Sequence, residues 1–205
     1  MPRFDTRLAL MRAAEQLFAQ QGVDRVSLRE IAIAAGQRNV SAATYHFGSK
    51  RELIESILER HSLPIQETWR PLIDPAVSAG ASLNELLRAV VKPLVEKIDD
   101  ADGGRSYLEL CAELVSSRSF PVVGMRITMT PEAVEISKRI AERGPDVDPM
   151  VRVIRSSRLT GLIYGSISDY LRLLNNGVEI PRALFVSDLV SVLAAAVRAE
   201  PPTAD

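Results

Sequence analysis

The chain has 205 residues, of which 46% are hydrophobic, 25% charged and 5% aromatic, with a net charge of −1. This composition is typical of globular domains, and the low aromatic content disfavours a β-sandwich or barrel. The single cysteine excludes an internal disulfide, and its combination with two histidines excludes the usual zinc sites. We expect a cytoplasmic protein with no signal peptide, membrane span, metal or cofactor.

Charge is unevenly distributed along the chain. Residues 1–62 carry 9 basic and 7 acidic side chains, whereas residues 63–205 carry 16 and 19. No carboxylate occurs between Glu30 and Glu52, although several basic residues lie there. Phosphate groups respond to such a local excess of positive charge rather than to the average of the chain. The N-terminal quarter is therefore compatible with nucleic-acid binding.

Two helices are predicted first. Apolar residues recur at helical spacing over Thr6–Gln21, and Gly22 is suited to end that helix. Ser27 and Glu30 form an S-x-x-E capping box at the start of a second helix, which is expected to stop at Gly36.

A very short third helix should follow a turn. Ser41 is placed to cap it, and it extends through Phe47 before Gly48. Ser49 begins a second S-x-x-E sequence and a fourth helix, expected to end at about His61. Three short helices with a tight turn between the second and third are typical of a helix-turn-helix.

The rest of the chain also reads as helical. Prolines divide residues 64–75 into short pieces, and the segment from Phe120 to Thr130 is expected to be irregular. Longer helices are predicted over Ser82–Ile98, Arg105–Ser117, Pro131–Arg143, Pro149–Asn175 and Pro181–Ala199. The expected architecture is all-α, with a helix-turn-helix domain over residues 1–62 and a larger helical domain over residues 63–205.

The short third helix is the predicted DNA-reading element. Phe47 and Ala43 can face inward, which leaves small side chains near its start and larger ones near its end. Arg3 and Arg7 precede it as a possible arm for the DNA backbone or a narrow minor groove. Arg38 and Asn39 could instead be plain turn residues, and Tyr45 could be buried. The candidate DNA contacts are Ser27, Arg38, Asn39, Ser41, Ala42, Thr44, Tyr45, His46 and Lys50.

Three blocks of this region resemble the DNA-binding domain of the tetracycline-repressor (TetR) family. They are Ala13-Ala14-x-x-Leu17-Phe18-x-x-x-Gly22, Ser27-Leu28-x-x-Ile31-Ala32-x-x-Ala35-Gly36 and Tyr45-His46-Phe47-Gly48-Ser49-Lys50-x-x-Leu53. The resemblance implies a homodimeric repressor that binds a palindromic operator and is released by a small molecule. The turn over residues 37–40 is one residue longer than is common in the family, so base reading could pass to Arg38 or Asn39.

Candidate effector and dimer residues follow from composition and periodicity. Each aromatic, methionine or cysteine residue of the larger domain has an ordinary core role as its alternative, and Cys111 reads as an inert buried thiol. The candidate lining of an apolar or amphipathic effector pocket is Trp69, Tyr107, Cys111, Phe120, Met125, Met129 and Tyr164. The last two helices are apolar on more than one face, which predicts a dimer through them. The candidate interface residues are Leu159, Gly161, Leu162, Gly165, Leu189, Val192 and Leu193.

Two other classes of function were weighed against a regulator. A small helical enzyme is disfavoured because no nucleophile–base pair, metal set or nucleotide motif stands out, so no catalytic residue is assigned. The other alternative is a ligand-binding or scaffold protein whose helix-turn-helix no longer binds DNA.

Overall fold

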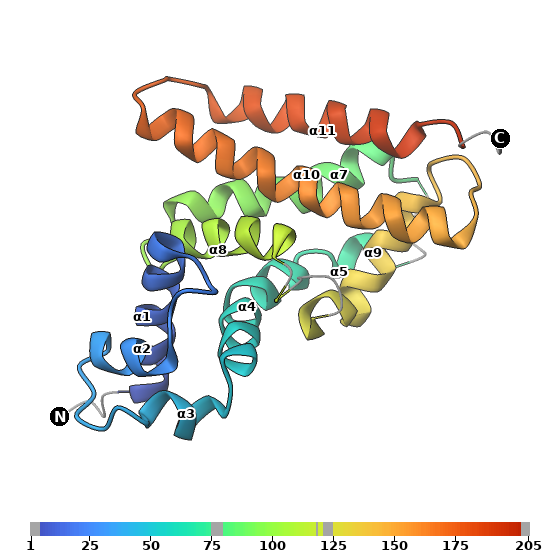
Figure 1. Ribbon diagram of the computed structural model, residues 1–205. Helices are drawn as coiled ribbons and strands as arrows, with labels where there is room; N and C mark the ends of the chain where they lie inside the picture. The colour runs from blue at the N-terminus through green and yellow to red at the C-terminus, as the bar shows by residue number, and fades with distance from the viewer. Residues whose placement is uncertain (1–4, 75–79, 118, 121–124, 202–205) are drawn as a thin grey trace.

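The computed structural model describes residues 5–74, 80–117, 119–120 and 125–201. These residues form helices and no strand, as the all-α prediction requires (Figure 1). The α-helices are α1 Thr6–Gln21, α2 Leu28–Ala34, α3 Ala42–Phe47, α4 Lys50–Glu67, α5 Arg70–Ile73, α7 Leu83–Glu96, α8 Gly104–Ser116, α9 Pro131–Ala141, α10 Pro149–Asn175 and α11 Arg182–Arg198. Two 3-10 helices, η1 Lys97–Asp99 and η2 Arg126–Met129, lie between them.

The N-terminal helices have the bounds and caps that the sequence predicts most clearly. Asp5 accepts hydrogen bonds from two backbone N–H groups at the start of α1, and Gly22 ends it with a φ of +86°, which favours glycine. Leu10, Ala14 and Phe18 of α1 are fully buried. The remainder of this small core comes from α2, α3 and α4, so burial on one face of each helix holds the domain together.

Helix α4 is longer than predicted. It continues past His61 and Pro64 to Glu67, although proline supplies no N–H to the helix and costs about 3 kcal/mol in its interior. Ile65 and Gln66, which follow the proline, are buried. Tertiary packing therefore outweighs the lost hydrogen bond, and the prediction that the helix ends at His61 is wrong. One continuous helix crosses the predicted domain boundary at residues 62 and 63.

The C-terminal helices form layers above the N-terminal ones (Figure 1). Helices α10 and α11 run side by side, with α8 packed on α10 and α7 on α11. Pro93 lies within α7, which continues to Glu96 before η1. The irregular segment predicted around residues 120–130 contains η2, whose Ile127 is buried. Within the described ranges, no helix is long and apolar enough to cross a membrane.

Helix α1 packs directly on α8 and so joins the small N-terminal core to the larger part of the fold. A buried polar group lies beside this contact. The Glu15 carboxylate, 1% exposed, accepts a hydrogen bond from Arg60 Nη1 at 2.7 Å and lies 3.1 Å from His61 Nε2. The His61 ring stacks on Tyr107 of α8 with centroids 4.6 Å apart. Burying a carboxylate is costly unless it is hydrogen-bonded, and these partners supply such bonding.

Candidate nucleic-acid interface

The start of α2 is fixed by a reciprocal capping box. The Ser27 hydroxyl accepts from the Glu30 N–H at 3.2 Å, and the Ser27 N–H donates to Glu30 Oε2 at 2.7 Å. These bonds to Ser27 hold the pKa of Glu30 below its usual value. Ser27 was a candidate DNA contact, and the structure gives its hydroxyl a capping partner within the chain.

The turn between α2 and α3 differs from the prediction in one cap. Ser41 precedes α3 but its side chain makes no capping hydrogen bond, because its ψ of 3° is not the extended conformation of an N-cap. Asn39 takes that role: its Oδ1 accepts from the Ser41 N–H at 3.0 Å, and its carbonyl accepts from the Ala42 N–H at 3.0 Å. The expectation that Ser41 caps α3 is therefore wrong, and the Asn39 side chain is partly occupied within the turn.

Helix α3 presents a narrow outward face. Thr44, Tyr45 and His46 are exposed, and Tyr45 is 84% exposed even though it is aromatic. The Tyr45 and His46 rings meet edge to face, with centroids 5.3 Å apart. The alternative that Tyr45 is a buried core residue is excluded.

Ala42 was predicted to face outward, but it is 7% exposed. The reason is that α3 contacts α1, α2 and α4, so more than one side of this six-residue helix is covered. Ala43 and Phe47 are buried as predicted. Ala42 is thus a packing residue, and the exposed positions of α3 are Thr44, Tyr45 and His46.

Arg7 also differs from its expected place. Its Nη2 donates to the Ser56 hydroxyl at 2.8 Å, and its guanidinium lies 4.9 Å from the centroid of the Phe47 ring. Arg7 therefore holds α1 against α3 and α4 rather than extending toward a groove. Arg3, the other residue of the predicted arm, lies outside the described residues.

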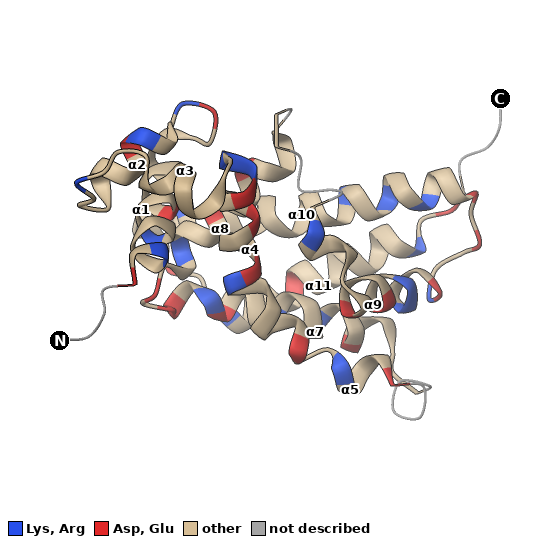
Figure 2. Ribbon diagram, turned by 90° about the horizontal axis from the view of Figure 1, so that it is seen from below, with Lys and Arg blue, Asp and Glu red and all other residues tan. Residues whose placement is uncertain are grey.

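The Lys50 side chain turns back into the fold. Its Nζ donates to the Val23 carbonyl at 2.8 Å and lies 5.6 Å from the centroid of the Phe120 ring. Arg38 is exposed and makes no ion pair in the part of the chain that the structure describes. Figure 2 shows basic segments on α2, on the turn that follows it and at the start of α4. Arg38 is thus available to a phosphate, whereas Lys50 already has a partner.

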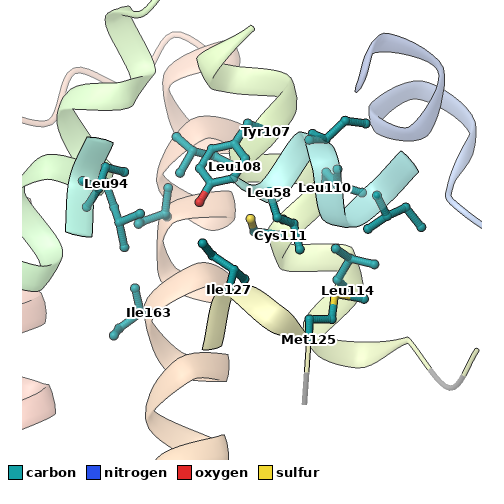
Figure 3. Packing of buried hydrophobic residues seen from close by; sticks show 14 of the residues in the cluster. Leu58, Leu94, Tyr107, Leu108, Leu110, Cys111, Leu114, Met125, Ile127 and Ile163 are labelled. Atoms are coloured by element: carbon teal, nitrogen blue, oxygen red, sulfur yellow. The ribbon is translucent and has the colours of Figure 1, made fainter. Parts of the chain in front are cut away.

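The predicted effector region is a packed core between α4, α8 and α10. Figure 3 shows Tyr107, Cys111 and Ile127 among the buried side chains. The Tyr107 hydroxyl lies 2.7 Å from the Ser62 hydroxyl, a partner that the sequence did not identify because serines carry no periodic signal. Burial raises the pKa of Tyr107, and it raises the pKa of the Cys111 thiol to about 12. Burial likewise raises the pKa of Tyr164. Such a core disfavours anions.

The other predicted pocket residues are dispersed. Trp69 is nearly buried and donates from Nε1 to the Ala89 carbonyl at 3.2 Å, and Met125 is fully buried. Met129 is 66% exposed because η2 turns it outward, so its place in the pocket lining is wrong. Phe120 faces Lys50 instead. The roof predicted over residues 120–130 falls partly outside the described residues, at 121–124.

Two open hollows lie away from this core. One, of about 630 Å³, is lined by Arg12, Glu15 and Gln16 of α1 and by residues 98–106. The other, of about 400 Å³, lies between α1 and α4. Among the described residues, no group of three or more histidines, cysteines or carboxylates could hold a metal ion.

The predicted dimer residues divide into buried, exposed and half-buried sets. Leu189 and Leu193 are buried within the subunit, where α11 packs on α7 and α10, so they cannot form an outer face of this chain. Gly165 and Val192 are exposed. The half-buried ones are Leu159, Gly161 and Leu162. The outward faces of α10 and α11 also carry exposed apolar residues that were not predicted for the interface, namely Val153, Ile154 and Leu184.

Comparison with known proteins decides the family of this helix-turn-helix. Residues 10–57 match the family model described as bacterial regulatory proteins, tetR family. The helix-turn-helix region, about a quarter of the chain, is therefore similar to the TetR family. Over 63 residues it is 40% identical to the HTH-type transcriptional repressor BepR of Brucella suis biovar 1 (strain 1330). That match covers 31% of this chain and 30% of BepR, less than a third of the length of this relative.

Several TetR-family structures share the whole fold at low sequence identity. A family protein from Shewanella sp. PV-4 is 17% identical with a TM-score of 0.64, covering 93% of this chain and 97% of that one. NalD, the secondary repressor of the MexAB-OprM multidrug efflux pump in Pseudomonas aeruginosa, is 23% identical with a TM-score of 0.58, covering 93% and 94%. SmeT, the repressor of the SmeDEF pump of Stenotrophomonas maltophilia, is 20% identical with a TM-score of 0.57, covering 93% and 87%. These likenesses show that the TetR fold extends beyond the N-terminal helices.

Proposed function

We propose that this chain is a cytoplasmic transcriptional repressor of the TetR family that binds a palindromic operator as a homodimer and is released by a small molecule. Residues 1–62 act as the DNA-binding domain, and residues 63–205 bind the effector and dimerise. The observation that carries the proposal is the outward face of α3, where Thr44, Tyr45 and His46 are exposed next to a region without carboxylates.

The exposed residues of this face have separate roles. Thr44 faces the base edges, because its hydroxyl can bond a base and its methyl group can contact a thymine methyl. Tyr45 and His46 lie at the far end of the short helix and contact phosphates. Arg38, which is exposed and without an ion pair in the described ranges, adds a phosphate or base contact from the turn. No catalytic role is assigned to the chain.

Dimerisation uses the outward faces of α10 and α11. These faces combine exposed apolar residues with Gly165, at which an added Cβ would meet no atom within 4 Å. A helix pair with an apolar outer face is buried by a twofold-related copy, which gives a four-helix bundle. Two copies of α3 then face successive turns of the major groove, so the operator should be twofold symmetric.

The effector binds in the core between α4, α8 and α10. Most side chains there are apolar, and the hydroxyl groups of Ser62, Tyr107 and Tyr164 and the Cys111 thiol add polar atoms, so an apolar or amphipathic molecule suits them. SmeT, which has a similar fold, has been solved in complex with triclosan. To release DNA, the effector must bind the DNA-free conformation more tightly than the DNA-bound one.

A gel shift on the DNA upstream of the gene for this chain tests the proposal. The wild type should retard the duplex, and Thr44→Ala should change the preferred base at one or two symmetric positions, each worth about 1–3 kcal/mol. The salt dependence of Thr44→Ala should equal that of the wild type, because threonine contributes no charge. If a folded wild-type protein binds this duplex no better than unrelated DNA, autoregulation fails. If it binds no selected duplex either, the chain is a ligand-binding or scaffold protein.

A further inference from the structure

The peptide group of Val23 is held from both sides. Its N–H donates to Glu113 Oε1 at 2.5 Å, and its carbonyl accepts from Lys50 Nζ at 2.8 Å. Val23 itself is fully buried in the turn between α1 and α2. Glu113 belongs to α8 and Lys50 begins α4, so three separate elements meet at one peptide group. We call Glu113, Val23 and Lys50 the turn clamp.

The neighbouring glycine is adapted to this clamp. Gly22 has a φ of +86°, and a Cβ at that position would lie 3.1 Å from Glu113 Oε1. The Glu113 carboxylate therefore sits directly over the turn, and the absence of a side chain at residue 22 lets it approach. Hydrogen bonds between ionised side chains and backbone groups are stronger than neutral ones, so the bonds from Lys50 and to Glu113 both hold the Val23 peptide group in place.

The Lys50 charge is already surrounded within the chain. Besides the Val23 carbonyl, the ammonium lies over the Phe120 ring, and its charge contributes to the lowered pKa of Glu30. An ammonium group has three N–H donors, so Lys50 can keep its bond to the Val23 carbonyl while another donor faces solvent. Losing that bond would leave the carbonyl of a buried residue without its ammonium partner.

We propose that Lys50 and Glu113 are positioning residues, which fix α2 and α3 relative to α8. Helix α2 follows the clamped turn directly, and α3 follows α2, so the orientation of the recognition helix depends on this turn. The effect of the clamp on DNA binding rests on the proposed function. Helix α8 also carries Tyr107 and Cys111, so a shift of α8 around an effector would move the turn between α1 and α2 through Glu113.

Hydrogen exchange of the Val23 amide in the full-length, DNA-free protein tests the clamp. Glu113→Met removes the acceptor and should speed this exchange about tenfold, whereas Glu113→Gln keeps an acceptor oxygen and should restore most of the protection. Lys50→Met should also speed it, because the turn loses its second anchor. Arg51→Met removes the same charge one residue away and should leave it unchanged. Unchanged exchange in both Glu113→Met and Lys50→Met would overturn the clamp.

DNA binding tests the consequence of the clamp through Glu113. The probe is a duplex selected by the wild type from a randomised library. Glu113→Met should weaken binding about five- to tenfold although it removes a negative charge, and Glu113→Gln should restore most of the affinity. Wild-type affinity in Glu113→Met would overturn the proposal that the clamp positions the recognition helix. If the wild type selects no duplex, the proposed function fails, and the exchange measurement still decides the clamp.

Discussion

Replacing Arg60 by methionine tests whether the contact between α1, α4 and the loop before α8 stabilises the fold. Arg60 Nη1 lies 2.7 Å from Glu15 Oε1, and Nη2 donates to the Asp102 carbonyl at 3.1 Å and pairs with the Asp102 carboxylate. Methionine keeps most of the aliphatic stem and the helix propensity of arginine. The substitution therefore removes mainly the charge and its hydrogen bonds.

The expected loss of stability in Arg60→Met follows from how deeply each partner of Arg60 is buried. The Asp102 side chain is 48% exposed, so the bonds to it contribute little in water. The Glu15 side chain is 1% exposed, and a buried hydrogen bond to a charged group contributes about 1.5–3 kcal/mol. His61 stays 3.1 Å from the same carboxylate oxygen and compensates in part. The free energy of unfolding should fall by about 2 kcal/mol in Arg60→Met.

Urea unfolding followed by circular dichroism measures this change. Arg12→Met is the matched control, because Asp102 is the one ion-pair partner of Arg12 among the described residues and both side chains are about half exposed. That control should lose less than about 1 kcal/mol. An Arg60→Met variant that is no less stable than Arg12→Met would refute the view that the buried Glu15 depends on Arg60.

Three further outcomes follow from burial, charge and packing. Because burial raises the pKa of Cys111 to about 12, a thiol reagent at pH 8 should label the folded protein far more slowly than the urea-unfolded one, and rapid labelling of the folded state would contradict this. Hydrogen bonds from Arg60 lower the pKa of Asp102, so its stabilisation is present above the unfolded pKa of about 4 and is lost as the pH falls through the folded value. Between pH 7 and pH values below 4, the free energy of unfolding in urea should therefore fall less for Asp102→Asn than for the wild type. An equal fall in both proteins would contradict a stabilising role of the Asp102 carboxylate. Gly165→Leu has room within the subunit, so it should weaken only the dimer, by about tenfold in sedimentation equilibrium, and an unchanged dimer would exclude this face.

Local rules predicted the N-terminal elements well. Capping sequences indicate where a helix begins, because the Ser27 and Ser49 hydroxyls each accept a hydrogen bond from the backbone N–H of the residue three positions later. A glycine can indicate where a helix ends, as Gly22 does for α1. The exposed face of α3 could be read in the same way for Thr44 and His46, because a short helix has few positions to bury.

The errors share a physical cause: tertiary contacts outweigh local preference. Pro64 was expected beyond the end of α4, yet burial of the residues after it carries the helix onward. Arg7 was expected to extend toward DNA, but its long side chain turns back onto the Phe47 ring. The Glu113 contact could not be foreseen, because 90 residues separate it from Val23.

Selection of duplexes from a randomised library by the full-length protein tests the central claim most directly. The claim is that α3, through Thr44 and its exposed neighbours, reads a specific sequence in each of two symmetric half-sites. Successive rounds should enrich one twofold-symmetric sequence, and the footprint of the wild type on it should cover two adjacent major-groove turns. A folded protein that enriches no sequence, or only a sequence without symmetry, would contradict the account of a dimeric operator-binding repressor.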